Sequence, residues 1–567
     1  MVDARWDSLK DLPPGQGLVD QGRDIATTVK VGRTAFFDHY GVSSERQYRE
    51  QGRAAGRLFT AFNIGMKDWP ATREALQRIE YQCLERGVRP PDHWQFIPER
   101  RMGLLKEQRR AAMQETGPVL WDDDDWRDWG SCTTMMQPQA GDNMIGGPAS
   151  IDNAIDALKA GSTYVGCLSQ MTWRWPYFDN DVAQMSAVIT ACGLLGAKSS
   201  EGVVLDSYLE DGYPAIFVDY GSLIGWSLIE RQIARLCGAT IAIAWGGLTS
   251  DPINKSIVSI ALDMLDPDHV PPTFVQGDTI SYTTDLERNA AICSEDTLFM
   301  LAVQHRYRTG SAALPVPLTE NLRIPTAEEI VQVQVMAREL ERRVPEICDH
   351  VRWDVLEERA TVLAHKGEQF YERVMGALQD DGVNVEDVLQ LTVALRRLGA
   401  DEIERRFGFT ADDDHHRPTE LFARAAAAVL TDHPADLSEE VVVLGSTDVH
   451  VAAKNALAAS LDKCGAKVID CGVNCDPEDL VSAACRDGAS AIVITTHNGV
   501  AWSYGSQLVT LCEQEDRRFR LFMGGVLNED SPDSPSPVDV TEKLNGLGIS
   551  TPLNIHTLID ALTSSDL

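Results

Sequence analysis

Two polar side chains near the C-terminus stand at a spacing that suits metal chemistry. The apolar run Val441–Leu444 predicts a buried strand, and the loop after it carries Asp448 and His450. A histidine on a strand-end loop can bind a metal ion through one ring nitrogen. A carboxylate two residues earlier can orient the other ring N–H, which fixes the direction of the imidazole. We therefore treat His450 as a candidate metal ligand and Asp448 as its supporting acid.

The sequence around this loop alternates predicted strands and helices. Apolar runs predict strands at 467–471, 490–495 and 520–523, and a helix over 477–486. Such alternation is typical of an open, doubly wound parallel sheet. Ligands of these sheets bind at the carboxyl ends of the strands, which is where Asp448 and His450 are expected.

This pattern resembles the cobalamin-binding domain of base-off/His-on B12 enzymes, whose signature is Asp-x-His-x-x-Gly, then Ser-x-Leu, then Gly-Gly. The resemblance implies that His450 is the lower axial ligand of cobalt and that Asp448 is its hydrogen-bonded partner. The other positions that it brings to the cofactor are Ala453, Thr495, His497, Gly499, Gly524 and Gly525.

The chain departs from this signature at two positions. Ala453 stands where the family has glycine, and His497 stands where it has leucine. Thr495 keeps the hydroxyl that would hydrogen-bond the nucleotide tail of the cofactor, so we interpret the site as altered but intact. The alternative is a response-regulator-like doubly wound domain with an incidental Asp-x-His pair.

Composition excludes several classes of protein. The chain has 567 residues, enough for several domains, and a formal net charge of −34. This charge argues against a nucleic-acid partner, because phosphate binding needs a basic face. No apolar run approaches the length of a membrane span and the first residues lack a signal-peptide pattern, so we expect a cytoplasmic protein without a membrane partner. The twelve cysteines are expected to be reduced. Two loop thiols are favoured over a metal site at Cys471 and Cys475.

The rest of the chain divides into blocks of different pattern. We expect a helical N-terminal extension over 1–125, with helices at 45–62, 70–86 and 99–115. A catalytic domain follows at 126–330, a helical segment that completes it at 331–405, a linker at 406–438 and the cobalamin-binding domain at 439–567. The charged runs 122–125 and 412–416 are interpreted as a solvated turn and a solvated linker.

The middle block alternates strands with long helical patterns. Strands are predicted at 131–136, 163–168, 202–205, 215–218, 240–244, 272–276 and 312–316, with helices at 151–160, 182–195 and 223–237. Repeated strand–helix units joined by short polar loops favour an α/β fold, here a (β/α)8 TIM-like barrel.

Three segments of this block resemble the catalytic barrel of glutamate mutase (methylaspartate mutase). They are Met136–Gly141, Lys198–Gly202 and Leu322–Glu329. The small subunit of that enzyme carries the B12 domain, so this chain looks like both subunits joined over roughly 130–345 and 439–567. The resemblance implies adenosylcobalamin, with its cobalt, as cofactor and a radical carbon-skeleton isomerisation as the reaction.

The resemblance also implies site residues. Glu201 matches the acid that accepts from the substrate ammonium group, and Tyr208 and Tyr213 follow roughly where the family has two active-site tyrosines. Gln139 replaces one of three arginines that grip the carboxylates of glutamate, and Arg174 could match either of the others. Because a neutral amide binds a carboxylate more weakly than an arginine does, we expect an amino acid-like or carboxylic acid substrate other than free glutamate.

Alternative interpretations without a catalytic role stay open for these residues. Glu201 could be an ordinary loop carboxylate. Strand alternation would put Arg174 on the face opposite Trp173 and Trp175, but Arg174 could equally make a surface cation–π contact. The whole chain could be a non-isomerase corrinoid protein, such as a methyl carrier, a sensor or a degenerate barrel, which Ala327 in place of a family lysine would suit. The expected partners are a small-molecule substrate and, in a homodimer, a second copy of the chain.

Overall fold

The computed structural model describes residues 4–564, except 113, 174, 176, 410–435, 449–450, 498, 516–517, 530 and 532–536, and gives no side chains for 4, 5, 7, 401, 451 and 452. The chain forms two compact units. Residues 1–111 and 117–418 make up the first, and residues 112–116 and 419–567 make up the second. No described helix is both long and apolar enough to cross a lipid bilayer.

The described part of the first unit contains eight strands, and every pair that they form is parallel. They are β1 (Phe59–Ile64), β2 (His93–Phe96), β3 (Gln137–Gln139), β4 (Tyr164–Val165), β5 (Val204–Tyr208), β6 (Ile241–Ala244), β7 (Phe274–Gln276) and β8 (Ala312–Leu314). One sheet has the order β3-β2-β1-β8-β7 and another has the order β4-β5-β6. Isolated parallel bridges join Ala140 to Val165 and Trp245 to Val275, next to the ends of these sheets.

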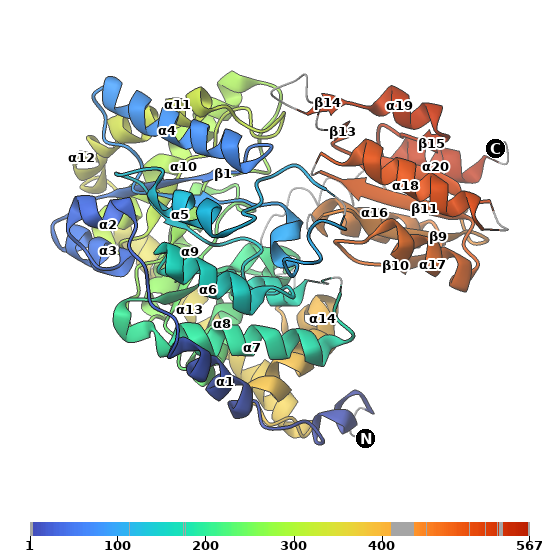
Figure 1. Cartoon of the computed structure of the whole chain (residues 1–567), viewed down its shortest axis with the longest axis horizontal. Helices are drawn as coiled ribbons and strands as arrows, with labels where there is room; N and C mark the ends of the chain where they lie inside the picture. Colours follow the sequence, from blue (N-terminus) through green and yellow to red (C-terminus); the bar gives the residue numbers. More distant parts are fainter. Residues whose placement is uncertain are drawn as a thin grey trace. The chain divides into compact units, whose positions relative to one another are not determined.

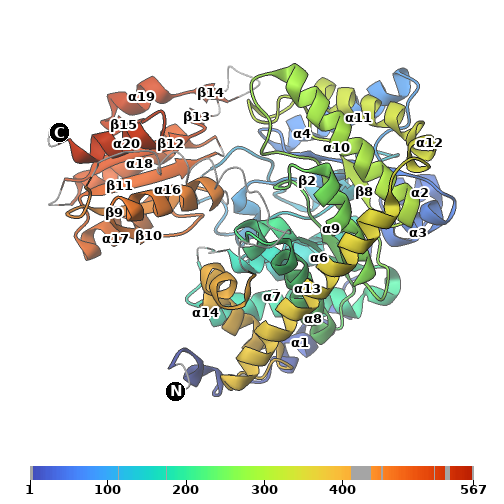
Figure 2. The same cartoon turned by 180° about the vertical axis from the view of Figure 1, so that it is seen from behind.

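Helices separate the strands along the sequence (Figures 1 and 2). They are α1 (Gln16–Ala26), α2 (Ala35–Tyr40), α3 (Glu45–Ala54), α4 (Trp69–Glu85), α5 (Asp123–Ser131), α6 (Ser150–Ala160), α7 (Asp181–Ala197), α8 (Tyr220–Cys237), α9 (Pro252–Met264), α10 (Leu286–Tyr307), α11 (Ala327–Glu341), α12 (Val344–Cys348), α13 (Trp353–Asp380) and α14 (Val388–Phe407). Polar caps fix where many of them begin: Asn180 accepts the N–H of Ala183 at the start of α7, and Thr326 and Glu329 form a capping box on α11. A cap of this kind stabilises a helix by about 1 kcal/mol.

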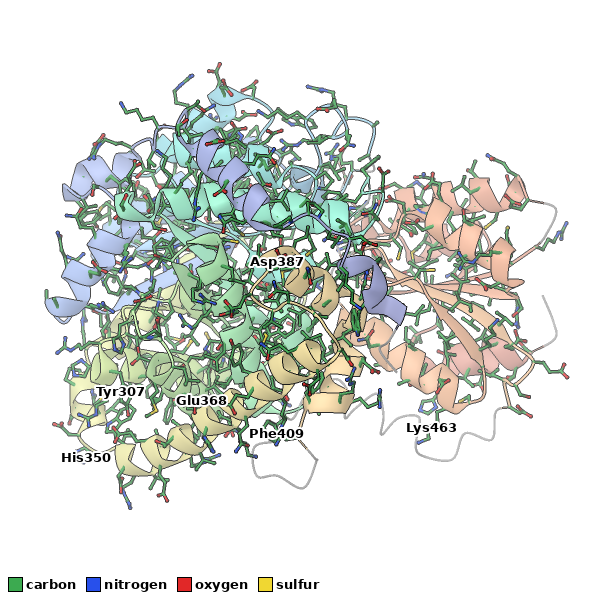
Figure 3. The ribbon with its side chains drawn as sticks, turned by 90° about the horizontal axis from the view of Figure 1, so that it is seen from below. Tyr307, His350, Glu368, Asp387, Phe409 and Lys463 are labelled. Carbon is green, nitrogen blue, oxygen red and sulfur yellow. The ribbon has the colours of Figure 1, made fainter. Side chains whose placement is uncertain are left out.

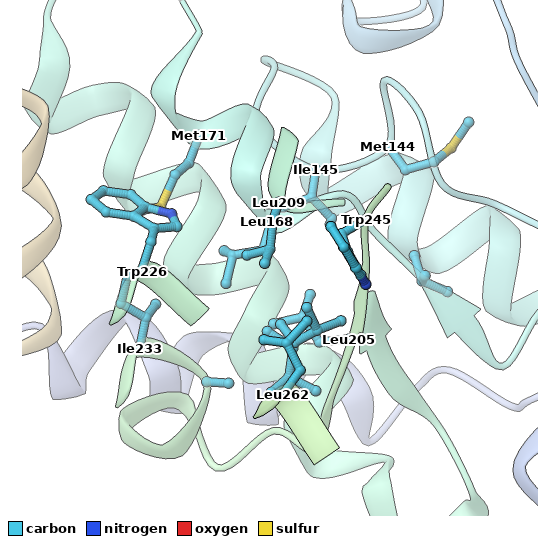
Figure 4. Close-up of a cluster of buried hydrophobic side chains, with 14 of the residues drawn as sticks. Met144, Ile145, Leu168, Met171, Leu205, Leu209, Trp226, Ile233, Trp245 and Leu262 are labelled. Atoms are coloured by element: carbon cyan, nitrogen blue, oxygen red, sulfur yellow. The ribbon is translucent and has the colours of Figure 1, made fainter. Parts of the chain in front are cut away.

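The core of the first unit lies where these helices pack on the strands. Figure 4 shows Leu205 of β5 among side chains that include Trp226 and Ile233 of α8 and Leu262 of α9. All four are buried. Removing each such side chain from water contributes roughly 1.5–3 kcal/mol, so apolar burial orients the helices on the sheet.

The helices of residues 327–407 belong to the first unit. Asp387, labelled in Figure 3, caps α14 by accepting the N–H groups of Leu389 and Gln390. Its other carboxylate oxygen accepts the N–H of Gly15, 2.8 Å away, just before α1. One buried turn therefore ties the end of this segment to the start of the chain. The expected linker lies mostly outside the described residues, together with 412–416.

Several sequence-based expectations about the first unit were wrong. The range 1–125 is not wholly helical, because it contributes β1 and β2, which pair with β8 and β3. The expected helix at 99–115 is a short 3-10 turn (Arg100–Gly103) followed by turns, and the expected strand at 215–218 is absent from the described structure. The expected strand at 131–136 also shifts, since α5 runs to Ser131 and β3 begins at Gln137.

The second unit is built on five parallel strands in the order β10-β9-β11-β12-β15. They are β9 (Val441–Ser446), β10 (Lys467–Asp470), β11 (Ala491–Thr496), β12 (Arg520–Gly525) and β15 (Ile549–Ser550), with a separate antiparallel pair, β13 (Asn528–Glu529) and β14 (Val538–Asp539). The helices are α16 (Val451–Lys463), α17 (Pro477–Asp487), α18 (Ala501–Glu513), α19 (Thr541–Gly546) and α20 (Ile555–Thr563).

Helices cover both faces of this sheet. Val443 and Ile492 pack in one apolar cluster with α17, α18 and α19, whereas Val442 and Ala491 pack in another with α16 and α20. Successive strand residues point to opposite faces, so a continuous apolar run such as Val441–Leu444 supplies both clusters. The doubly wound sheet predicted from the alternation is confirmed. Its strand order reverses between β9 and β11, and ligands of such sheets bind at this reversal.

Candidate functional site

The carboxyl ends of β9 and β11 form a buried polar cluster in the second unit. Asp448 follows β9 and is 5% exposed. Its carboxylate accepts the hydroxyl of Ser446 at 3.4 Å, the hydroxyl of Thr447 at 3.2 Å and the backbone N–H of His497 at 2.6 Å. The backbone N–H of Thr447 donates to the carbonyl of Thr495 at 2.9 Å. Thr447 and Asp448 therefore join the two strand-end loops.

Thr495 brings an unused hydroxyl to the same place. The residue is 6% exposed, and its Oγ1 has no hydrogen-bond partner among the residues that the structure describes. Leaving a buried hydroxyl unsatisfied costs about 1–3 kcal/mol. A ligand that hydrogen-bonds this oxygen would remove that cost.

The two glycines that end β12 leave room beside this hydroxyl. Gly524 pairs with Thr495 across the sheet, and a methyl group added to its Cα would meet no atom within 4 Å. Gly525 has a φ of +105°, and an added Cβ would lie 2.2 Å from the carbonyl oxygen of Thr496. Only glycine fits position 525, and position 524 keeps open space at the strand end. Gly499 also has a positive φ, +73°.

The remaining expected residues of this unit are placed as follows. Ala453 lies exposed in the first turn of α16, and the side chain of His497 is exposed while its N–H is held by Asp448. His450 lies outside the described residues. The thiol of Cys475 donates to the carbonyl of Cys471 at 3.2 Å. Among the described residues, no group of three or more His, Cys, Asp or Glu side chains is arranged to hold a metal ion.

Residues 441–539 match the family model of the B12 binding domain. The second unit contains a B12-binding domain. No curated protein matches the chain. The unpartnered hydroxyl of Thr495 and the open space at Gly524 both fit a cobalamin-type cofactor at the switch point of this domain.

The first unit has its own polar cluster at strand carboxyl ends. Asp142 follows β3, Gln170 follows β4 and Asp211 follows β5. The side-chain amide of Gln170 donates to Asp142 at 3.2 Å and to Asp211 at 3.1 Å. Burial, together with the neighbouring Asp211 carboxylate, raises the pKa of Asp142 well above its usual range. Two carboxyl groups thus share one amide, and one of them is a candidate to hold a proton near neutral pH.

Tyr208 and Glu210 extend this cluster along the β5 loop. The Tyr208 hydroxyl donates to Glu210 at 3.0 Å and accepts the N–H of Gly247 at 2.9 Å. Glu210 also accepts the N–H groups of Gly246 at 2.7 Å and Leu248 at 3.1 Å. Burial and the Glu210 charge raise the pKa of Tyr208 well above its usual range. Tyr208 therefore stays a neutral hydroxyl that positions the loop after β6.

Trp173 and Trp175 close one side of this acidic cluster. Trp173 donates its ring N–H to the carbonyl of Asp211, and Trp175 donates to the carbonyl of Gln170 at 3.4 Å. Both rings are buried. They follow the 3-10 helix Leu168–Thr172. Arg174 itself lies outside the described residues.

The other residues expected in the barrel site do not join this cluster. Glu201 lies before β5, at its amino end, with its side chain 46% exposed and paired to Lys198 at 2.9 Å. Gln139 is fully buried and donates to Glu45 at 2.6 Å. Tyr213 packs its ring against Trp226, with centroids 4.9 Å apart. Of the expected residues, Tyr208 is joined to this region, because its carbonyl accepts the hydroxyl of Ser169 and its own hydroxyl bonds Glu210.

Sequence reasoning missed Asp142, Gln170, Glu210 and Asp211. The available signal was position rather than motif, because each residue lies within a few positions after a strand of the first unit. Acidic residues just after a parallel strand are candidates for the functional face of such a sheet.

Proposed function

We propose that this chain is an adenosylcobalamin-dependent radical carbon-skeleton isomerase acting on an amino acid-like or carboxylic acid substrate. The observation that carries the proposal is the partly buried cluster of Asp142, Gln170 and Asp211 at strand carboxyl ends, in a chain that also carries a B12-binding domain. Adenosylcobalamin, when bound, supplies a carbon radical able to remove hydrogen from an unactivated carbon. The reaction then needs a polar pocket that fixes the substrate.

A closed (β/α)8 barrel is part of this proposal. The bridge between Ala140 and Val165 continues the pairing from β3 to β4, and the bridge between Trp245 and Val275 continues it from β6 to β7. The pairing of β8 with β1 completes the series. With these links every strand of the first unit has two parallel neighbours. Enzymes with this fold place their catalytic residues at the carboxyl ends of the strands.

We assign roles in the B12-binding domain as follows. His450 is the ligand of cobalt, and Asp448 orients it through the second ring nitrogen. The hydroxyl of Thr495 forms a hydrogen bond with the nucleotide tail. This contact is favoured because the Thr495 oxygen is buried and has no hydrogen-bond partner among the described residues. The backbone at Gly524 and Gly525 passes close to the cofactor, with Ala453, His497 and Gly499 around it.

In the first unit, Asp142 and Asp211 are proposed to hold the amine or hydroxyl of the substrate. Two carboxylates around one amide favour a cationic or hydrogen-bond-donating group. Arg174, which follows the same loop as Gln170, is proposed to bind one substrate carboxylate. Tyr208 positions Glu210 and the β6 loop beside them.

The same charges argue against free glutamate as the substrate. Position 139 carries a neutral amide that already donates to Glu45, so it offers no cation to a second carboxylate. Glu210 and the Asp142–Asp211 pair, which shares one proton in this proposal, add negative charge on the same side of the sheet. A like charge held within a few ångströms is unfavourable, which favours a substrate with a single free carboxylate.

The test is anaerobic spectrophotometry of the full chain with adenosylcobalamin. We expect the visible spectrum of the complex to change when a singly carboxylated amino or hydroxy acid is added, and deuterium from that substrate to enter the cofactor. L-Glutamate and 3-methylaspartate serve as comparison substrates. Asp142→Asn should keep the affinity for the cofactor and weaken the response to substrate.

Cofactor binding without any substrate-dependent change or deuterium transfer would contradict the isomerase. That result would favour the alternative, a corrinoid protein that carries a methyl group, senses the cofactor or uses it as a scaffold. Efficient turnover of free glutamate would instead contradict only the substrate assignment.

A further inference from the structure

A cavity of about 810 Å³ opens at the amino ends of β4 and β5. The acidic cluster lies at the other, carboxyl ends of these strands. Its walls come from residues 30–33, from the start of α3 at 43–50, from Lys159 and from residues 199–202. Lys159 ends α6 just before β4, and residues 199–202 directly precede β5. The cavity lies wholly within the first unit.

The cavity is basic in a strongly acidic chain. Four cations line it (Lys30, Arg33, Arg46 and Lys159) against two carboxylates, Glu50 and Glu201, a formal excess of two positive charges. The whole chain carries −34. A locally positive electrostatic potential on a strongly negative protein attracts anions.

Both carboxylates of the cavity are already engaged. Glu50 pairs with Arg46 at 2.9 Å, and Glu201 pairs with Lys198 at 2.9 Å. Among the residues that the structure describes, neither Lys30 nor Lys159 has a carboxylate partner. Two ammonium groups, on adjoining segments of the wall, are therefore available to a ligand.

The walls are held in place by glycines at tight contacts. A Cβ on Gly32 would lie 1.9 Å from the carbonyl oxygen of Lys159, and the N–H of Gly32 donates to Leu158 at 2.8 Å. Gly202 has a φ of +86°, and its Cβ would lie 2.3 Å from the hydroxyl of Ser44. These approaches fix the backbones that carry Lys30, Lys159 and Glu201 relative to α3, so the charged side chains extend from a rigid frame.

The lining also indicates the chemistry of a ligand. Hydroxyl groups of Ser43, Ser44, Ser199 and Ser200 accompany the cations, and none of the described lining residues is aromatic. Serine hydroxyls and ammonium groups suit phosphate or carboxylate oxygens. The absence of an aromatic platform in this lining disfavours a ligand recognised by a stacked base.

We propose that this cavity is a binding site for a small organic anion with at least two negative groups, either a phosphate ester or a polycarboxylate. Lys30 and Lys159 hold the anionic groups, and Ser199 and Ser200 donate to the remaining oxygens. The site is separate from the proposed isomerase centre and does not depend on cobalamin. Glu201 belongs to its wall, where its charge weakens rather than supports anion binding.

Isothermal titration calorimetry of the full chain tests this site, with inorganic pyrophosphate and citrate as probes and sodium chloride at matched ionic strength as the blank. We expect saturable binding of at least one probe, which weakens as the salt concentration rises. Each exposed charge contact contributes up to about fivefold in affinity. Lys30→Ala with Lys159→Ala should therefore lower the affinity about tenfold.

The matched control is Lys463→Ala with Lys467→Ala, which removes the same charge from exposed lysines of the second unit. It should leave the affinity unchanged. Glu201→Gln should raise the affinity by a few fold, because it removes a like charge from the wall. Preference for pyrophosphate would identify a phosphate ester, and preference for citrate a polycarboxylate. Binding of neither probe above the chloride blank, or equal affinity in wild type and the Lys30/Lys159 variant, would overturn the proposal.

Discussion

The two strand-end clusters of this chain differ in how far apart their residues lie in sequence and how they are held. In the second unit, two consecutive residues after β9 meet three consecutive residues at the end of β11: Thr447 bonds Thr495 and Thr496, and Asp448 accepts the N–H of His497. In the first unit, Asp142, Gln170 and Asp211 come from three loops spread over about seventy residues. A site built from short fixed spacings is visible in sequence, whereas a site assembled by loops of different lengths is not.

The largest expected effect concerns the ligand of the B12-binding domain. With cob(II)alamin bound, His450→Ala should abolish the nitrogen hyperfine coupling of a protein imidazole in the electron paramagnetic resonance spectrum, because no second nitrogen replaces it. His497→Ala is the control and should keep the coupling, since the substitution retains the backbone N–H that His497 donates to Asp448. Persistence of the nitrogen coupling in His450→Ala, or loss of this coupling in His497→Ala, would contradict the assignment of His450 as the cobalt ligand.

A second prediction tests how much the long-range contacts of one buried arginine stabilise the first unit. Arg49 of α3 is 1% exposed and bonds Glu45 at 2.8 Å, the carbonyl of Thr273 at 2.8 Å and the carbonyl of Gly310 at 2.9 Å. Arg49→Met would leave Glu45 buried without its cation, which costs about 3–5 kcal/mol. We expect the free energy of unfolding of the first unit to fall by that amount. Urea titration monitored by tryptophan fluorescence measures it.

The exposed pair on the same helix supplies the control for this experiment. Arg46→Met breaks the partly exposed contact with Glu50 and should cost less than about 1 kcal/mol. Cobalamin affinity should not change in either variant if the two units are independently stable. An Arg49→Met protein as stable as wild type would show that the buried network contributes little.

The contrast between the units also explains which elements the sequence could predict. β9 and β11 are continuous apolar runs, and α7 is a long apolar helix, so their patterns are unambiguous. β1 was missed because its six residues follow a helical pattern with hardly a break, and the partner that stabilises it, β8, lies about 250 residues later. Local periodicity carries no information about such a partner.

The misplacement of Glu201 has a similar cause. A motif match gave its residue type but not the direction of the neighbouring strand. Glu201 precedes β5, whereas Tyr208 ends it, and a five-residue strand separates its two ends by about 13 Å at roughly 3.3 Å per residue. Asp448 escaped this error because the strand before it was itself clear in the sequence.

A third prediction uses the acidic cluster of the first unit. Because the pKa of Asp142 is raised in the folded protein, the native state binds more protons than the unfolded state between the usual and the raised pKa. The free energy of unfolding should therefore fall as pH rises through this window, by at most about 1.4 kcal/mol per pH unit. Asp142→Asn should flatten this dependence.

Urea titrations of wild type and Asp142→Asn from acidic to neutral pH measure the difference. Asp124→Asn, an exposed carboxylate at the start of α5, is the control and should leave the slope unchanged. Parallel pH profiles for wild type and Asp142→Asn would show that Asp142 titrates normally and that the cluster is not a proton-holding pair.

The smallest effect we predict should change sign with the cofactor. Thr495→Val replaces a buried hydroxyl that has no partner among the described residues with a methyl group of similar size. Without cobalamin the B12-binding domain should gain about 1 kcal/mol of stability, because an unsatisfied polar atom is removed. The variant should bind cobalamin about tenfold more weakly, since the hydrogen bond to the nucleotide tail is lost.

Thr496→Val is the comparison: the Thr496 hydroxyl is bonded to Thr447 at 2.9 Å, so its loss should destabilise the domain even without cofactor. Thermal unfolding with and without cobalamin separates these cases, and a Thr495→Val protein that is destabilised in the absence of cofactor would show that its hydroxyl is not held in reserve for a ligand.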